Sequence, residues 1–167
     1  DCDNTLWGGV VGEDGLDGII LGQDGYGKAF EDFQKTIKNI SDKGILLALL
    51  SKNSEKDVMD VFNDHNSMIL KKDDIVISKI NWKEKSKNIL EIASELNLGL
   101  DSMVFWDDNP IEREKVKINI PDVSVVEPPK NVFDWPQHLK NLNFFSKFKI
   151  TPEDSKKKEQ YKIRSKF

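Results

Sequence analysis

The chain has 167 residues, which is enough for one domain of ordinary size with a short tail and too few for two full enzymatic domains. Apolar residues make up 38% and charged residues 32%, and no apolar stretch approaches the roughly 18 to 20 residues that a membrane span needs. The net charge of -4 does not attract nucleic acid, and the single cysteine, Cys2, excludes a disulfide framework, so we expect a cytoplasmic protein without membrane or nucleic-acid partners.

The first part of the chain predicts a flap, a helix and a buried strand. Residues 7–23 alternate glycines with short apolar groups, which is typical of a small β-hairpin flap that turns at 13–15. Apolar residues at helical spacing over 29–40 predict a helix, and Gly44 ends it. The continuous apolar run at 45–50 predicts a buried strand.

The rest of the chain continues this alternation of helices and apolar runs. Further helices are predicted from Ser54, over 84–96 and after Pro110, and short apolar runs lie at 68–70, 75–77, 103–106 and 123–126. Apolar strands separated by helices indicate a parallel sheet covered on both faces, which is a three-layer α/β/α sandwich. We place this domain at 1–150 and expect 151–167, with six basic and three acidic residues, to form a basic tail or linker helix.

The polar cluster at 1–5 opens the chain without an apolar strand before it. In α/β folds such clusters usually lie at the carboxyl end of a strand. We therefore expect a first strand upstream of Asp1.

Polar side chains follow the predicted strands or begin the helices after them. Because the carboxyl ends of parallel strands meet at one edge of a sheet, these side chains should gather there. Crowded carboxylates need a cation, and hard oxygen ligands select Mg²⁺. A nearby lysine and hydroxyl suit phosphoryl transfer. The residues concerned are Asp1, Asp3, Ser51, Lys85, Asp107 and Asp108.

Each of these residues also has a plainer interpretation. An Asp-x-Asp pair is commonly a turn or a helix cap, and 107–110 could only cap the helix that begins at Pro110. Ser51 and Lys85, taken singly, could be surface residues. The order of all four groups at successive strand ends favours the functional interpretation.

The motifs resemble those of the haloacid dehalogenase (HAD) superfamily of phosphotransferases. Asp1-Cys2-Asp3-Asn4-Thr5 is similar to its D-x-D-x-T motif, and Ser51, Lys85 and Asp107-Asp108 are similar to its second, third and fourth motifs. The stretches at 7–15 and 51–53, Asn81-Trp82 with Lys85, and Asp107 through Arg113 and Glu114 are similar to the FkbH-like branch of subfamily IIIC. One departure is Glu84, where that branch often has proline.

The resemblance implies a role for each matching residue. Asp1 would be the nucleophile, Asp3 the general acid and base, and Ser51 and Lys85 would hold the phosphoryl group. Mg²⁺ would bind the Asp1 carboxylate, the Asp3 carbonyl and Asp107, with Asp108 a ligand or its neighbour. The residues expected to bind substrate are Thr5, Trp7, Gly8, Gly9, Lys52, Asn53 and Asn109.

The spacing of the motifs leaves no room for a lid domain. Only 49 residues separate Asp1 from Ser51, and 33 separate Ser51 from Lys85. We therefore expect a capless site that a partner closes. The FkbH-like resemblance implies loading of a glyceryl unit from an acyl phosphate onto an acyl carrier protein in polyketide biosynthesis, and the tail resembles the lead into a fused acetyltransferase-like domain.

Other functions remain open at this point. The domain could be a sugar-phosphate phosphatase in glycan biosynthesis, or a non-catalytic module that docks a carrier protein. Cys2, between the two aspartates, could fill the core. It could instead be exposed by a bend in the chain and hold the glyceryl group as a thioester, which would make it catalytic.

Overall fold

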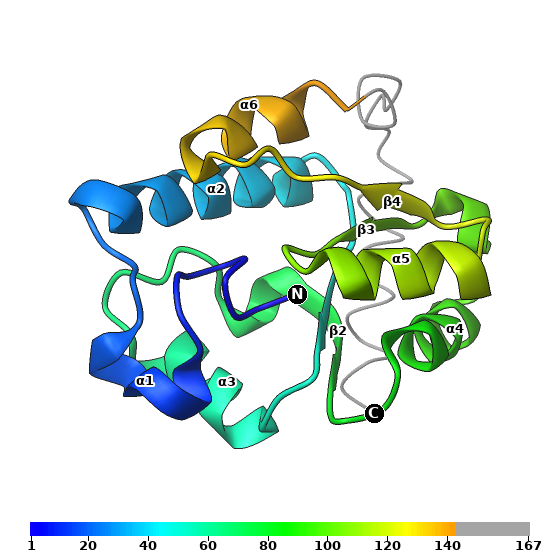
Figure 1. Cartoon of the computed structure of the whole chain (residues 1–167), viewed down its shortest axis with the longest axis horizontal. Coiled ribbons are helices and arrows are strands. Elements are labelled where there is room, and N and C mark those ends of the chain that lie inside the picture. The colour runs from blue at the N-terminus through cyan, green and yellow to red at the C-terminus, as the bar shows by residue number, and fades with distance from the viewer. Residues whose placement is uncertain (143–167) are drawn as a thin grey trace.

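The computed structural model describes residues 1–142, so the end of the expected domain and the tail at 151–167 lie outside the described residues. Helices and strands alternate along most of the described part (Figure 1). The helices are α1 (Val11–Gly18), α2 (Gly25–Asp42), α3 (Glu55–Asp64), α4 (Lys85–Leu96), α5 (Pro110–Asn119) and α6 (Trp135–Lys140). The strands are β1 (Leu47–Ser51), β2 (Ile75–Ile80), β3 (Val104–Trp106) and β4 (Ser124–Val126).

The helices begin and end at residues suited to those positions. The Ser54 side chain caps α3 by accepting from the Asp57 backbone nitrogen at 3.4 Å, and Asn109 caps α5 in the same way. Gly44 follows α2 with φ +98°, a conformation that glycine adopts without steric cost. Within residues 1–142, no helix has the length and apolar character needed to cross a membrane.

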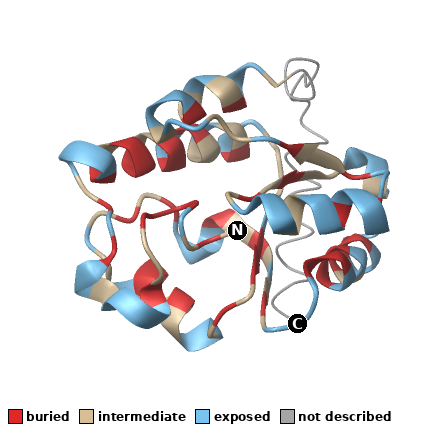
Figure 2. Cartoon of the chain, viewed as in Figure 1, coloured by how far each residue is buried: buried red, intermediate tan, exposed pale blue. Residues whose placement is uncertain are grey.

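The strands lie between two hydrophobic cores. Leu49 and Leu50, consecutive in β1, belong to different cores, because side chains alternate between the faces of a strand. The Leu49 core includes apolar residues of α2, α3 and α6, whereas the Leu50 core includes residues of α4 and α5. Figure 2 shows buried residues along the strands with exposed residues on the outer helices. The predicted three-layer α/β/α arrangement is therefore confirmed.

The sheet differs from the single parallel sheet that the sequence predicts. β1 pairs with β2 and β3 pairs with β4, both in parallel, as two separate pairs. A largely apolar cavity of about 410 Å³ is lined by both β1 and β3, and Asp1 also lines it. This is where a strand upstream of Asp1 would join the two pairs, and that strand stays a prediction.

The predicted β-hairpin flap is wrong in its secondary structure. A single antiparallel bridge between Gly8 and Ile20 closes the segment, with mutual backbone hydrogen bonds of 2.8 and 2.9 Å. Between them the chain forms α1, because the Val10 carbonyl accepts helical bonds and the Asp14 carboxylate accepts from the Val10 nitrogen at 2.8 Å. Gly15, with φ +74°, bends this helix, so glycines that suggest a hairpin turn instead serve a kinked helix.

The apolar cavity predicts a large stabilisation by an added strand. A chain carrying six Val, Ile and Leu residues directly before Asp1 should unfold at higher guanidinium concentration, because each buried apolar side chain contributes about 1.5 to 3 kcal/mol. A chain with six Ser and Lys residues there is the matched control. Equal unfolding free energies for the two chains would contradict the expectation.

Candidate functional site

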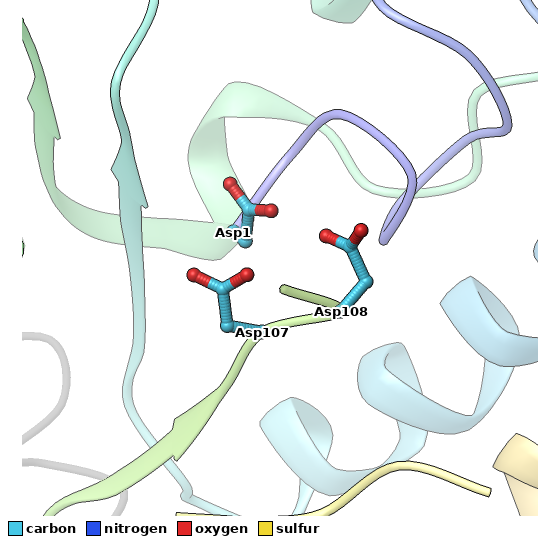
Figure 3. A group of neighbouring side chains, drawn as sticks. All are labelled: Asp1, Asp107 and Asp108. Carbon is cyan, nitrogen blue, oxygen red and sulfur yellow. The ribbon is translucent and has the colours of Figure 1, made fainter. Parts of the chain in front are cut away.

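Three aspartate carboxylates converge where β3 ends (Figure 3). Asp107 and Asp108 follow Trp106 directly, and the Asp1 backbone nitrogen donates to the Trp106 carbonyl at 3.2 Å. One carboxylate oxygen from each aspartate lies within 4.8 Å of those of the other two. Residues more than a hundred positions apart in the sequence therefore share one site.

Lys85 neutralises part of this negative charge. It is the first residue of α4 and is 4% exposed, and its Nζ lies 3.2 Å from Asp1 Oδ1 and 2.5 Å from Asp107 Oδ2. Asp107 is fully buried. A buried ammonium group needs such partners to offset its loss of hydration.

The remaining charge favours a divalent cation. Three carboxylates and one lysine leave two negative charges when all are ionised. Burial raises the pKa of the Asp108 carboxyl, and the charge of Asp107 raises it further. Because the ligands are carboxylate oxygens, the site has the donor chemistry of Mg²⁺.

Asp3 points to a different set of partners. Its Oδ1 accepts from Trp7 Nε1 and from the Val11 backbone nitrogen, both at 3.0 Å, and its Oδ2 accepts from Asn53 Nδ2 at 2.7 Å. The Asp3 carboxylate is not among the three that form the cluster. Asp1 and Asp3 are therefore available for different chemical tasks, and the expected role of the Asp3 carbonyl as a metal ligand stays a prediction.

Ser51 joins the site through Asn53. Ser51 ends β1 and is 2% exposed, and its carbonyl accepts from the Asn81 nitrogen at 3.1 Å. The Asn53 amide lies 3.4 Å from Ser51 Oγ and 2.7 Å from Asp3 Oδ2. This contact brings the end of β1 next to the first motif.

Thr5 and Arg113 support the aspartates. The Thr5 hydroxyl lies 3.3 Å from Asp1 Oδ2 and 3.1 Å from Asp108 Oδ1. Thr5 therefore contacts two of the clustered carboxylates, and its expected contact with substrate stays a prediction. Arg113 Nη1 donates at 3.0 Å to the carbonyls of both Asp107 and Asp108. The sequence places Arg113 within the stretch that resembles the FkbH-like branch but assigns it no role, because a contact between its side chain and backbone carbonyls leaves no pattern in the sequence.

Of the other residues expected to bind substrate, Lys52 and Asn109 are at least partly exposed, whereas Gly8 and Gly9 lie close to neighbouring side chains. Lys52 is partly exposed and pairs with Glu112 at 3.1 Å and with Glu84 at 3.7 Å. Asn109 is exposed and caps α5. Gly8 and Gly9 are close to neighbours, since a Cβ on Gly8 would lie 2.9 Å from Ile20 Cβ and one on Gly9 would lie 2.6 Å from Asp14 Oδ2. Substrate binding by these residues stays a prediction.

Two expectations for the first motif need correction. Trp7 is fully buried and its indole nitrogen donates to Asp3, so it lies behind Asp3 and does not present itself to a substrate. Cys2 is also fully buried in the core, and burial raises the pKa of its thiol to about 11. The exposed thiol that a thioester role needs is therefore absent, because the Cys2 side chain packs into the hydrophobic core that also contains Leu49.

The chain is similar to one structurally characterised phosphatase domain. No family model matches the chain, and no curated protein matches it. A crystal structure of the N-terminal part of the protein BF1531 from Bacteroides fragilis, containing a phosphatase domain complexed with Mg, is 46% identical with a TM-score of 0.84. The match covers 87% of the present chain and 39% of that chain.

Mg²⁺ is expected to stabilise the fold through Asp108. A folded pKa above the unfolded value means that stability is lost as pH rises through the folded pKa, so ionisation of Asp108 costs stability and a bound cation would offset that cost. Mg²⁺ at 100 times its Kd should add about 2.7 kcal/mol to the unfolding free energy.

Thermal unfolding at pH 7 with and without Mg²⁺ measures this effect. Asp108→Asn should be at least as stable without Mg²⁺ and should gain much less from it. Asp101→Asn, at an exposed position before β3, is the control and should keep the full gain. An undiminished gain in Asp108→Asn would show that Asp108 has no part in holding the cation.

Proposed function

We propose that this domain is a Mg²⁺-dependent phosphatase of the HAD type that forms an aspartyl phosphate on Asp1. The observation that carries the proposal is the convergence of Asp1, Asp107 and Asp108 around the buried Lys85. The 46% identity to a phosphatase domain crystallised with Mg supports it.

The first step transfers the phosphoryl group to Asp1. A carboxylate oxygen of Asp1 forms a bond to phosphorus while the bond to the leaving oxygen breaks, and Asp3 gives that oxygen a proton. Lys85, which already contacts Asp1 Oδ1, offers positive charge to the equatorial phosphoryl oxygens. Bound Mg²⁺ would neutralise charge on the phosphoryl group and align it with Asp1.

The second step releases phosphate and restores the site. Water attacks the phosphorus of the aspartyl phosphate and gives its proton to Asp3, and the bond to Asp1 breaks. Ser51, at the end of β1, would donate a hydrogen bond from its hydroxyl to a phosphoryl oxygen in both steps. Asp3 returns to the protonated form and is ready for the next substrate.

The hydrogen bonds of Asp3 indicate which oxygen moves the proton. A carboxylate oxygen accepts about two hydrogen bonds, and Oδ1 already accepts from Trp7 and Val11. Within residues 1–142, Oδ2 accepts a hydrogen bond from Asn53 alone, so it has room for a proton. Asp3 would therefore act through Oδ2.

The nucleophile is tested by replacing Asp1. Asp1→Asn should lower the rate of phosphate release from aryl phosphates by about three orders of magnitude or more, because an amide oxygen is a poor nucleophile and the aspartyl phosphate cannot form. Asp101→Asn is a control with the same chemical change at a distant exposed position. Substantial activity in Asp1→Asn would exclude the covalent mechanism.

A finer proposal concerns the acceptor. We propose that the domain transfers a glyceryl unit from an acyl phosphate donor to an acyl carrier protein, as the FkbH-like motifs imply. The carrier thiol would attack the acyl carbon while the bond to the acyl phosphate breaks, so that inorganic phosphate leaves and the thiol proton passes to solvent. Asp1 would act separately, by removing a phosphate ester from the donor. Within residues 1–142 the motif residues are separated by α1, α2 and β1, and then by α3, a three-residue 3-10 helix and β2, so no lid domain intervenes. A carrier protein could close such a site, and a sugar-phosphate phosphatase in glycan biosynthesis is the alternative.

Mass spectrometry distinguishes the two activities. An acyl carrier protein incubated with the domain, Mg²⁺ and a glyceryl phosphate donor should gain the mass of one glyceryl unit if transfer occurs. Free phosphate with an unchanged carrier mass would support hydrolysis alone. A mixture without the domain separates enzymatic transfer from spontaneous reaction of the donor, and the Asp1→Asn variant shows whether phosphate removal at Asp1 is needed for the transfer.

A further inference from the structure

The indole of Trp7 is buried against the core with one polar atom facing Asp3. Trp7 is 0% exposed, and its ring lies edge-on to Phe62 with centroids 6.5 Å apart. Its Nε1 donates to Asp3 Oδ1 at 3.0 Å. A buried indole N–H needs a partner, and here the partner is the proposed general acid.

Asn53 holds the other oxygen of the same carboxylate. It is 5% exposed, and its Nδ2 donates to Asp3 Oδ2 at 2.7 Å. Its own Oδ1 accepts from the Ser54 nitrogen at 2.9 Å, which fixes the amide with its NH₂ group toward Asp3. Both oxygens of Asp3 are therefore held from opposite sides by side chains of two separate segments.

We infer that Trp7 and Asn53 are positioning residues that orient Asp3 for protonating the leaving oxygen, an inference that rests on the proposed phosphatase function. A carboxyl group that transfers a proton must lie within hydrogen-bond reach of the leaving oxygen. Trp7 and the Val11 nitrogen occupy Oδ1 and so stop the carboxylate from rotating. Oδ2, guided by Asn53, is then presented to the substrate.

This role has a consequence that a merely structural role lacks. A poor leaving group needs a proton as it departs, whereas 4-nitrophenolate leaves without one. Loss of Asp3 orientation should therefore affect phenyl phosphate far more than 4-nitrophenyl phosphate, although the two esters are close in shape. Because kcat/KM reports the steps through phosphoryl transfer, its ratio for the two esters measures this dependence.

The experiment removes the Trp7 N–H with the least change of shape. Trp7→Phe, and benzothienylalanine incorporated at position 7, which replaces N–H by sulfur and keeps the two-ring shape, are assayed beside Asn53→Ala. Each should lower kcat/KM for phenyl phosphate by about tenfold or more and change that for 4-nitrophenyl phosphate by less than about threefold.

Trp135→Phe is the matched control for loss of a buried indole bond. Trp135 is 4% exposed and its Nε1 donates to the Pro129 carbonyl at 2.7 Å, away from Asp3. This variant removes the same kind of bond and a similar volume, and it should leave the ratio of the two esters unchanged. Assays are run below the unfolding range of each variant, as determined by thermal unfolding.

Two results would overturn the inference. If kcat/KM for the two esters falls equally, or does not fall, in the benzothienylalanine and Asn53→Ala proteins, neither residue orients the proton donor. If Trp135→Phe changes the ratio as much as Trp7→Phe, the effect is general loosening of the fold. Failure of the underlying phosphatase mechanism is a distinct result, because it appears as retained turnover of both esters in Asp1→Asn.

Discussion

The buried ion pairs of Lys85 are the interaction on which the site depends. Three carboxylates within 4.8 Å of one another repel, and burial raises this cost. Lys85 contacts two of them from the start of α4, and Thr5 lies between Asp1 and Asp108. The negative charge that Lys85 leaves unpaired favours a divalent cation, and the bound cation together with Lys85 would attract a phosphoryl group.

The first motif divides three neighbouring side chains among three environments. Asp1 faces the carboxylate cluster, Cys2 enters the core, and Asp3 is held by Trp7, Val11 and Asn53. The proposed nucleophile and the proposed proton donor are thereby kept apart although only one residue separates them. This division explains how two chemically identical carboxylates could perform different steps of one reaction.

The frame of the site comes from strands that have a core on each face. β1 and β3 place Ser51 and Asp107 at corresponding ends, and Arg113 holds the carbonyls of the loop that follows β3. The bridge between Gly8 and Ile20 holds the backbone next to Trp7, whose indole supports Asp3. The positions of the aspartates therefore depend on hydrogen bonds and packing of residues that are not themselves part of the carboxylate cluster.

The sequence by itself determined the alternation of helices and strands, the three layers and the residues of the carboxylate site, because apolar runs define strands and parallel strands end at one edge. It misjudged the segment at 7–23, where glycines suit a kinked helix as well as a hairpin. Only the tertiary structure decided the partners of Asp3, the burial of Cys2 and Trp7, and the role of Arg113. These depend on hydrogen bonds and packing between distant segments, which no local pattern of residue types encodes.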